Sequence, residues 1–194
     1  MKGSHNSLTY GRPCRWWGWL LLPLWRCQRR GLSAQIARGC VSFDIRVIRR
    51  RGMPSFWGHG RMWGSAHGIV DVEVNPVSAI GEICARVDRP YIRVILERGD
   101  DEQAERDFVD LCGRLESRYP QVRFYGGIRK RGWVQLYRFA GDDGGLERTL
   151  VQHVGSMQSR YGKLLPGLWA WLHRRDIPAE AGSSDLPIVA LDMI

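Results

Sequence analysis

Short apolar runs and amphipathic segments alternate along this chain of 194 residues. Runs rich in β-branched and aromatic residues predict strands at 40–48, 91–97, 121–127 and 187–194. Apolar residues at helical spacing predict helices at 31–39, 76–87, 101–119, 131–139 and 164–175. A hairpin-like return is expected at 53–60, after the first strand. Such alternation is typical of α/β proteins with parallel strands.

The composition fits one domain over residues 1–194, because 44% of the residues are hydrophobic and the length suffices for a sizeable core. The formal charge of +9 favours anionic partners such as phosphate-bearing lipids, anionic membrane surfaces or nucleic acid, and does not choose among them. The arginine-rich runs at 26–30 and 46–52 are explained more simply by a solvated surface than by nucleic-acid binding.

Cysteine usage gives no sign of a disulfide framework or a structural zinc site, because the five cysteines are odd in number and form no CxxC pair. The most apolar stretch, 16–25, is shorter than the ~20 residues of a spanning helix. We expect no export signal in the chain as written. The tryptophans of this stretch are open to two interpretations: insertion into a bilayer interface, or packing against the protein.

The carboxyl ends of the predicted strands collect a small set of polar side chains. Because functional groups of parallel α/β sheets gather at these ends, they are the candidate site residues. They are Asp44, Arg46, His59, Glu97 and Asp192. Three further histidines, His67, His153 and His173, are predicted to be ordinary exposed residues.

Two histidines on opposite sides of a phosphate can act as base and acid in phosphodiester cleavage, because imidazole titrates near neutral pH. An arginine supplies the permanent positive charge that the transition state requires. His5, His59 and Arg46 are the residues that fit these roles.

The joint pattern SHNS (4–7), FDIR (43–46) and GHG (58–60) resembles the catalytic half of phosphatidylinositol-specific phospholipases C, especially the smaller bacterial kind. Gln28 and Gln35 resemble the helix that precedes the family's Asp-x-Arg strand. The resemblance implies a TIM-type (β/α) barrel, distorted or incomplete, with a truncated first strand. It also implies an enzyme of lipid metabolism, a phosphoric diester hydrolase that is formally a lyase.

The resemblance assigns roles to individual residues. His5 is expected to take the proton of the inositol 2-hydroxyl, and His59 to protonate the departing diacylglycerol oxygen. Arg46 is expected to hold the phosphoryl oxygens, which leads to a cyclic inositol phosphate. The supporting residues are Asn6 and Asp44, which orient Arg46 or the hydroxyl, Asp192, which fixes the tautomer of His5, and Glu97 and Arg98, which bind substrate.

The resemblance also bears on cofactors and location. Animal members bind calcium, with Asn6, Asp44 and Glu97 as the matching positions here, but Ser42 stands where the calcium type has a carboxylate. Because bacterial members use an arginine instead, no cofactor is expected and calcium is the alternative. The expected partner is a phospholipid or inositol phosphodiester, with peripheral contact to an anionic membrane. The family is secreted, although this chain shows no signal peptide.

Three alternatives remain open. The first is a catalytically impaired barrel that binds anionic lipid headgroups or a partner, since Asn6 stands where bacterial enzymes commonly have Asp. The second is a glycerophosphodiester phosphodiesterase, which ranks lower because its Glu-x-Asp pair is Ser42-Phe43-Asp44 here. Nucleic-acid binding rests on charge alone, ranks last and is not expected.

Overall fold

The computed structural model describes residues 1–50, 62–98, 101–130, 133–137, 139–142, 144–153, 168, 172 and 188–192. The elements in chain order are β1 (Lys2–Ser4), α1 (Trp17–Leu20), α2 (Leu22–Trp25), α3 (Leu32–Ala37), β2 (Ser42–Arg49), β3 (Trp63–His67), β4 (Val70–Val72), α5 (Pro76–Arg86), β5 (Tyr91–Leu96), α6 (Glu102–Arg118), β6 (Arg123–Lys130), β7 (Trp133–Leu136), α7 (Gly145–Thr149), β8 (Leu150–His153) and β9 (Ile188–Leu191).

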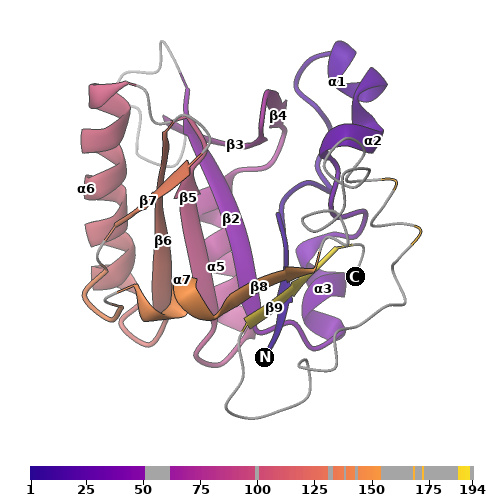
Figure 1. The fold of residues 1–194 in the computed structure, drawn as a ribbon. Coiled ribbons are helices and arrows are strands. Elements are labelled where there is room, and N and C mark those ends of the chain that lie inside the picture. Colours follow the sequence, from indigo (N-terminus) through magenta and orange to yellow (C-terminus); the bar gives the residue numbers. More distant parts are fainter. Residues whose placement is uncertain are drawn as a thin grey trace.

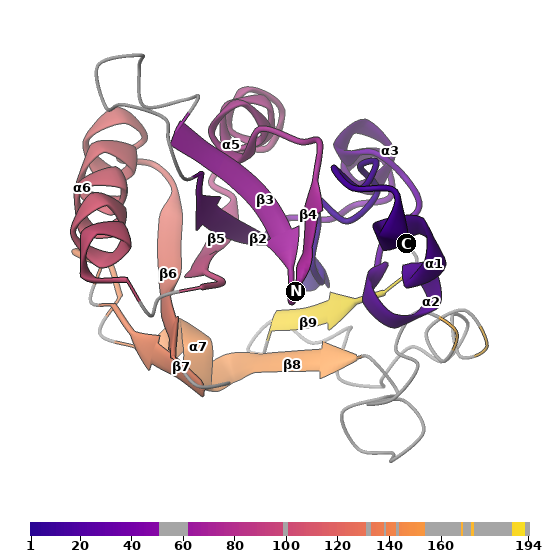
Figure 2. The ribbon, with the colours of Figure 1, turned by 90° about the horizontal axis from the view of Figure 1, so that it is seen from above.

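The described strands form one sheet in the order β7-β6-β5-β2-β1-β9-β8. From β6 to β8 all neighbours are parallel, whereas β7 runs antiparallel to β6. A second branch leaves β2, where antiparallel β3 pairs with it and β4 pairs with β3. The sheet is curled, with α5 and α6 on its outer side (Figures 1 and 2). This mixed α/β arrangement is consistent with the expected incomplete barrel.

The residues of β2 alternate between an apolar and a polar face. Phe43, Ile45 and Val47 are 0% exposed and join the apolar core, which α5 and α6 complete. The intervening Asp44 and Arg46 lie on the opposite face, because successive side chains of a strand point to opposite sides. The curled sheet therefore has a polar inner face, although β2 is buried on both faces.

The neighbouring strands extend this polar inner face. In β5, Ile92, Val94 and Leu96 belong to the apolar core, so the side chain of Arg93 takes the other face. The register aligns Asp44 with Arg93, and Arg93 with Tyr125 of β6. Parallel pairing thus places residues from distant parts of the sequence in one row across the sheet.

Seven of the fifteen described elements match the sequence prediction. Helices were expected at the positions of α3, α5 and α6, and strands at those of β2, β5, β6 and β9. The prediction of a helix at 131–139 is wrong, because Trp133–Leu136 forms β7 and completes a hairpin with β6. The open edge of β6 offers main-chain partners to this short segment, and that tertiary context overrides its helical pattern. The hairpin-like return predicted at 53–60 lies outside the described residues. Of the helix predicted at 164–175, only residues 168 and 172 are described, and both are helical.

The first strand, β1, has three residues. β1 is short, but it pairs in parallel with β2 on one side and β9 on the other. It is therefore a central strand of the described sheet, held by both neighbours. Within the described part of the chain, no helix has the length and apolarity needed to cross a membrane.

Two consecutive glycines allow β6 to run close to its neighbours. Gly126 has φ of +120°, and a Cβ there would lie 2.2 Å from the carbonyl oxygen of Val94. At Gly127 a Cβ would lie 2.0 Å from the oxygen of Gln135 in β7. Any larger residue would push the strands apart at the point where the sheet turns from β5 through β6 into β7.

We therefore expect Gly126→Ala to lower the free energy of unfolding by about 2–4 kcal/mol, from backbone strain and the clash with Val94. Gly113→Ala is the matched control, because Gly113 lies in α6 and a Cβ there meets nothing within 4 Å. That control is expected to gain up to about 1 kcal/mol in stability. Urea unfolding of the two variants measures the difference, and equal stabilities would contradict the close approach.

Candidate active site

The backbone of His5 is fixed at the end of β1 by two partners. Its N–H donates to the carbonyl oxygen of Leu191 in β9 at 3.0 Å. The side chain of Gln28 donates to the oxygens of both His5 and Leu191, at 3.1 and 2.7 Å. These bonds tie the loop to the sheet, and His5 is only 5% exposed.

The next residues of this loop are tied to β2. The N–H of Ser7 donates to the carbonyl oxygen of Asp44 at 2.9 Å, and the N–H of Asp44 donates to Oγ of Ser7 at 3.0 Å. Gln35 accepts from Ser4 and donates to the oxygen of Ser7. Asn6, which directly precedes Ser7, has φ of +46°, a conformation that asparagine tolerates better than most residues. The SHNS segment is thus a rigid loop.

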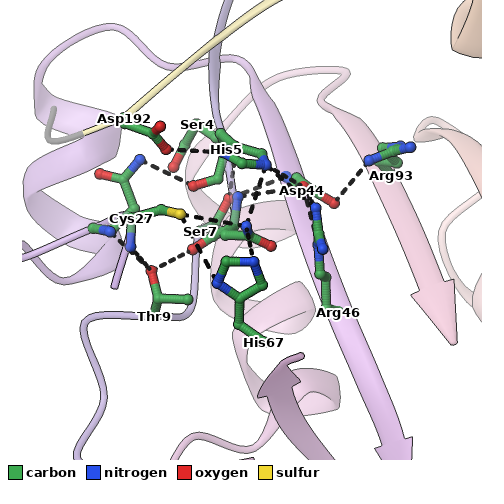
Figure 3. A network of polar contacts seen from close by, with 12 residues as sticks. Ser4, His5, Ser7, Thr9, Cys27, Asp44, Arg46, His67, Arg93 and Asp192 are labelled. Carbon is green, nitrogen blue, oxygen red and sulfur yellow. Dashed lines mark hydrogen bonds and ion pairs between the residues drawn. The ribbon is translucent and has the colours of Figure 1, made fainter. Parts of the chain in front are cut away.

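The imidazole of His5 has different partners at its two nitrogens (Figure 3). Nδ1 donates to Oδ1 of Asp192 at 2.8 Å. Nε2 faces two donors, Nη2 of Arg46 and Nδ2 of Asn6, each at 3.2 Å. Because the carboxylate accepts the proton of Nδ1, the lone pair of Nε2 is available to take a proton. The structure thus places Asp192, the residue expected to orient His5, within hydrogen-bond distance of Nδ1.

Arg46 lies between two buried carboxylates. Its guanidinium donates to Oδ2 of Asp44 and to Oε2 of Glu97, in both cases at 3.3 Å. Burial lowers the pKa of Arg46, but the two carboxylates raise it by more. The guanidinium therefore keeps its charge although it is only 7% exposed.

Asp44 is a carboxylate surrounded by positive groups. Burial raises its pKa, but Arg46, then Arg93 and then His5 lower it, and together hold it well below its usual range. Arg93 lies 3.5 Å from Oδ1 of Asp44 and is itself paired with Glu147 of α7. Asp44 is therefore ionised at neutral pH, and Arg93 is a neighbour that the sequence analysis did not identify.

His67 lies beside His5, and its prediction as an ordinary exposed residue is wrong. It ends β3 and is partly buried; the two ring centres are 6.4 Å apart. Its Nε2 lies 3.2 Å from Nδ2 of Asn6, and its Nδ1 contacts the carbonyl oxygen of Trp25. Burial first, and Arg46 next, lower its pKa to about 4. In the free protein His67 is therefore neutral at pH 7.

Glu97 connects Arg46 to the turn that carries His67. Its carboxylate accepts from the N–H of Gly68 at 2.8 Å and from Arg129 of β6. Burial raises its pKa, but Arg46 and Arg129 lower it by more. Arg98 lies apart from this group and contacts the carbonyl oxygen of Gly68 and the carboxylate of Asp71. Glu97 therefore lies inside the cluster and Arg98 outside it.

The structure brings together most of the residues proposed from the sequence. His5, Asn6, Asp44, Arg46, Glu97 and Asp192 form one network. His59 lies outside the described residues. The network also includes His67, Arg93 and Cys27, which the sequence analysis missed. The sequence held a signal for His67. Like His59, it is followed by a glycine, and it is the last residue of a short strand.

A comparison with solved structures finds proteins of similar fold. The fold is similar to that of phosphatidylinositol-specific phospholipase C from Listeria monocytogenes, with a TM-score of 0.50 and 12% sequence identity. The match covers 79% of this chain and 60% of that protein, so the chain spans less than two thirds of its length. No protein-family model and no curated protein matches the sequence. At this identity the likeness shows the fold alone.

The lowered pKa of His67 predicts how stability depends on pH. Its pKa falls from 6.5 to about 4 on folding, so the unfolded chain binds the proton more readily between these values. The folded state is expected to lose on the order of 2–3 kcal/mol from this group as pH falls from 6.5 to 4. His67→Asn, which cannot take up a proton, is expected to lose less.

Urea unfolding of both proteins at several pH values measures this difference. Since the carboxylates titrate in both proteins, the difference between the two curves isolates the imidazole. Identical slopes between pH 4 and pH 6.5 would show that His67 is not kept neutral by its surroundings.

Proposed function

We propose that this chain is a phosphodiesterase of the phosphatidylinositol-specific phospholipase C type. The carrying observation is that Nε2 of His5 and Nε2 of His67 both lie 3.2 Å from one atom, Nδ2 of Asn6. Two imidazoles thus face one point, with the guanidinium of Arg46 beside it. The similarity in fold to an enzyme named for phosphatidylinositol supports this substrate class.

The proposed reaction begins at His5. Its Nε2 takes the proton of the inositol 2-hydroxyl, whose oxygen attacks phosphorus. The bond from phosphorus to the diacylglycerol oxygen breaks, and a second imidazole gives that oxygen its proton. The products are a cyclic inositol phosphate and diacylglycerol, which makes the step formally a lyase reaction. In a slower second step, water opens the ring.

The second imidazole has two candidates. The family resemblance assigns the role to His59, whereas the contacts of the described residues favour His67. As an acid, His67 must carry a proton on Nε2 as well as on Nδ1. Although burial disfavours that form in the free protein, the negative charge of a bound phosphodiester favours it.

Asp192 and Arg46 support the two sides of this reaction. Asp192 keeps the proton of His5 on Nδ1 and stabilises the imidazolium that forms when Nε2 accepts a proton. Arg46 supplies a fixed positive charge to the phosphoryl oxygens. Because Asp44 and Glu97 hold the guanidinium in place, little reorganisation is needed during the reaction.

Calcium does not fit the residues that the family resemblance suggests for it. Calcium prefers six to eight oxygen ligands. Asp44 and Glu97 are already paired with arginines, and Arg46 lies between them. We therefore propose that Arg46 takes the place of a metal ion and that the reaction needs no cofactor.

The alternative function is an impaired barrel that binds an anionic lipid headgroup or a partner. One observation favours it: the exposed fractions of His5, Asn6 and Arg46 are only 5, 2 and 7%. These groups are therefore nearly closed to a substrate in this structure. Binding without turnover in the assay below would support this alternative.

The enzyme hypothesis predicts release of cyclic inositol phosphate from phosphatidylinositol vesicles in the presence of a calcium chelator. His5→Ala is expected to lower kcat by about 10²–10⁴-fold, because the general base is lost. His67→Ala and His59→Ala, measured in parallel, identify the acid as the variant with the comparable loss. Chromatography of the water-soluble products gives the rates.

Val109→Ala on the outer side of α6 is the control and should keep full activity. Absence of product from the full chain, or unchanged rates in His5→Ala, would sink the hypothesis.

Contact with an anionic membrane is the second part of the proposal. The α1–α2 patch consists of exposed apolar side chains: Trp16 (77%), Trp19 (49%), Leu20 (71%), Leu24 (39%) and Ile69 (69%). Ile69 lines a cavity with Arg15 and Trp17, which places the β3–β4 turn beside α1. Residues 1–43 contain no Asp or Glu, so α1, α2 and their flanking segments carry only positive charges. Asp71, which lines the same cavity as Ile69, is paired with Arg98. Indole rings beside cations suit an anionic bilayer surface.

Replacing Trp16 and Trp19 together by alanine is expected to weaken binding to vesicles containing anionic lipid by about tenfold or more, because two exposed indoles are lost. Val109→Ala is the matched control: it removes a 44% exposed apolar side chain on α6, away from the patch in Figure 2. Sedimentation with vesicles measures both. Equal binding by the two variants would exclude the patch as the contact surface.

A further inference from the structure

Cys27 lies in the candidate active site, and the proposed reaction gives it no role. Its side chain is 0% exposed and follows α2, whereas His5 follows β1 and Asp192 follows β9. One ligand atom of each residue lies within 4.8 Å of the other two. Figure 3 shows the side chains of Cys27 and Asp192 on the side of His5 that faces away from Arg46.

The three side chains are chemically suited to a soft divalent cation. A thiolate, an imidazole and a carboxylate are the ligands that Zn²⁺ takes in tetrahedral sites, at about 2.0–2.3 Å. Ligand atoms of such a site are about 3.3–3.8 Å apart. The ligand atoms of the cluster lie within 4.8 Å of one another, so its widest separation closes by at most about 1 Å, whereas Nδ1 of His5 and Oδ1 of Asp192, which are 2.8 Å apart, separate by about 0.5 Å. Arg46 does not oppose the ion strongly, because Asp44 and Glu97 pair with it.

Two buried acceptor atoms at this place lack a partner among the described residues. They are Oδ2 of Asp192 and Oδ1 of Asn6. The exposed fractions of these two residues are 7% and 2%. A buried acceptor without a donor costs free energy. An ion bound by Asp192 would satisfy the first of these atoms. The second would accept the proton of His5 Nε2 after rotation of the Asn6 amide.

We propose that His5, Cys27 and Asp192 bind one Zn²⁺ ion per chain. The thiol of Cys27 loses its proton to solvent, and the ring proton of His5 moves from Nδ1 to Nε2, so that sulfur and Nδ1 both face the ion. One carboxylate oxygen of Asp192 completes the three protein ligands. The fourth position is left to solvent, because Nδ1 of His67 is engaged with the carbonyl oxygen of Trp25.

This site stands independently of the phosphodiesterase. If the chain is that enzyme, the bound ion removes the contact between His5 and Asp192 and places a proton on the nitrogen that should act as base. Zn²⁺ is then an inhibitor, because it stabilises a form of His5 in which Nε2 cannot accept the substrate's proton. If the chain is not an enzyme, the ion binds in the same way.

The test uses cobalt as a spectroscopic substitute for zinc. The full chain, freed of metal with a chelator, is titrated with Co²⁺ at neutral pH. We expect a near-ultraviolet thiolate-to-cobalt charge-transfer band that saturates at about one ion per chain and disappears when Zn²⁺ is added. Cys27→Ser is expected to abolish the band, whereas Cys14→Ser, which removes an exposed thiol outside the cluster, should leave it unchanged.

Asp192→Asn is the second variant, because it keeps the thiol and the shape of the side chain. It is expected to weaken Co²⁺ binding by at least about tenfold. Circular dichroism establishes that each variant is folded. A full-length protein without the band in excess Co²⁺, or a band that survives in Cys27→Ser, would overturn the proposal. Because the readout is spectral, its failure is separate from failure of the activity assay.

Discussion

The contact of Arg46 with Asp44 and Glu97 is the interaction on which the rest of the candidate site depends. All three side chains are nearly buried, and a charge in that position is tolerated only when it is paired. The pairing fixes the guanidinium beside Nε2 of His5. Removing either carboxylate would leave a buried positive charge with one partner fewer. The site and the stability of the sheet interior are therefore coupled.

The same pairing joins elements that are far apart in the sequence. Asp44 and Arg46 come from β2 and Glu97 follows β5, while the N–H of Gly68 brings the β3–β4 turn to the same carboxylate. This last bond positions His67, which immediately precedes Gly68. The geometry of the two imidazoles thus depends on a carboxylate that need not touch substrate.

The functional proposal and the metal proposal concern opposite sides of one imidazole. Nε2 of His5 faces Arg46, where a phosphoryl group would bind, whereas Nδ1 faces Asp192, and Cys27 lies close to both His5 and Asp192. The phosphodiesterase proposal rests on the contacts of the first side. The second side follows from the cysteine of this particular chain. In these two proposals, His5 is the residue that both the reaction and its inhibition require.

The sequence alone determined the repeating elements and much of the site. Alternating apolar and polar residues define β2, and helical spacing defines α6, because both patterns are local. The SHNS and FDIR motifs identified His5, Asn6, Asp44 and Arg46, whose contacts follow once β1 and β2 are adjacent.

Only the tertiary structure decided the rest. The strand at β7 depends on the free edge of β6, a partner that its own residues do not specify. His67 and Cys27 become neighbours of His5 through the β3–β4 turn and the loop after α2, whose paths no local pattern encodes. Cys27 and His67 are 22 and 62 positions from His5 in the sequence. Long-range main-chain pairing and burial therefore set their positions.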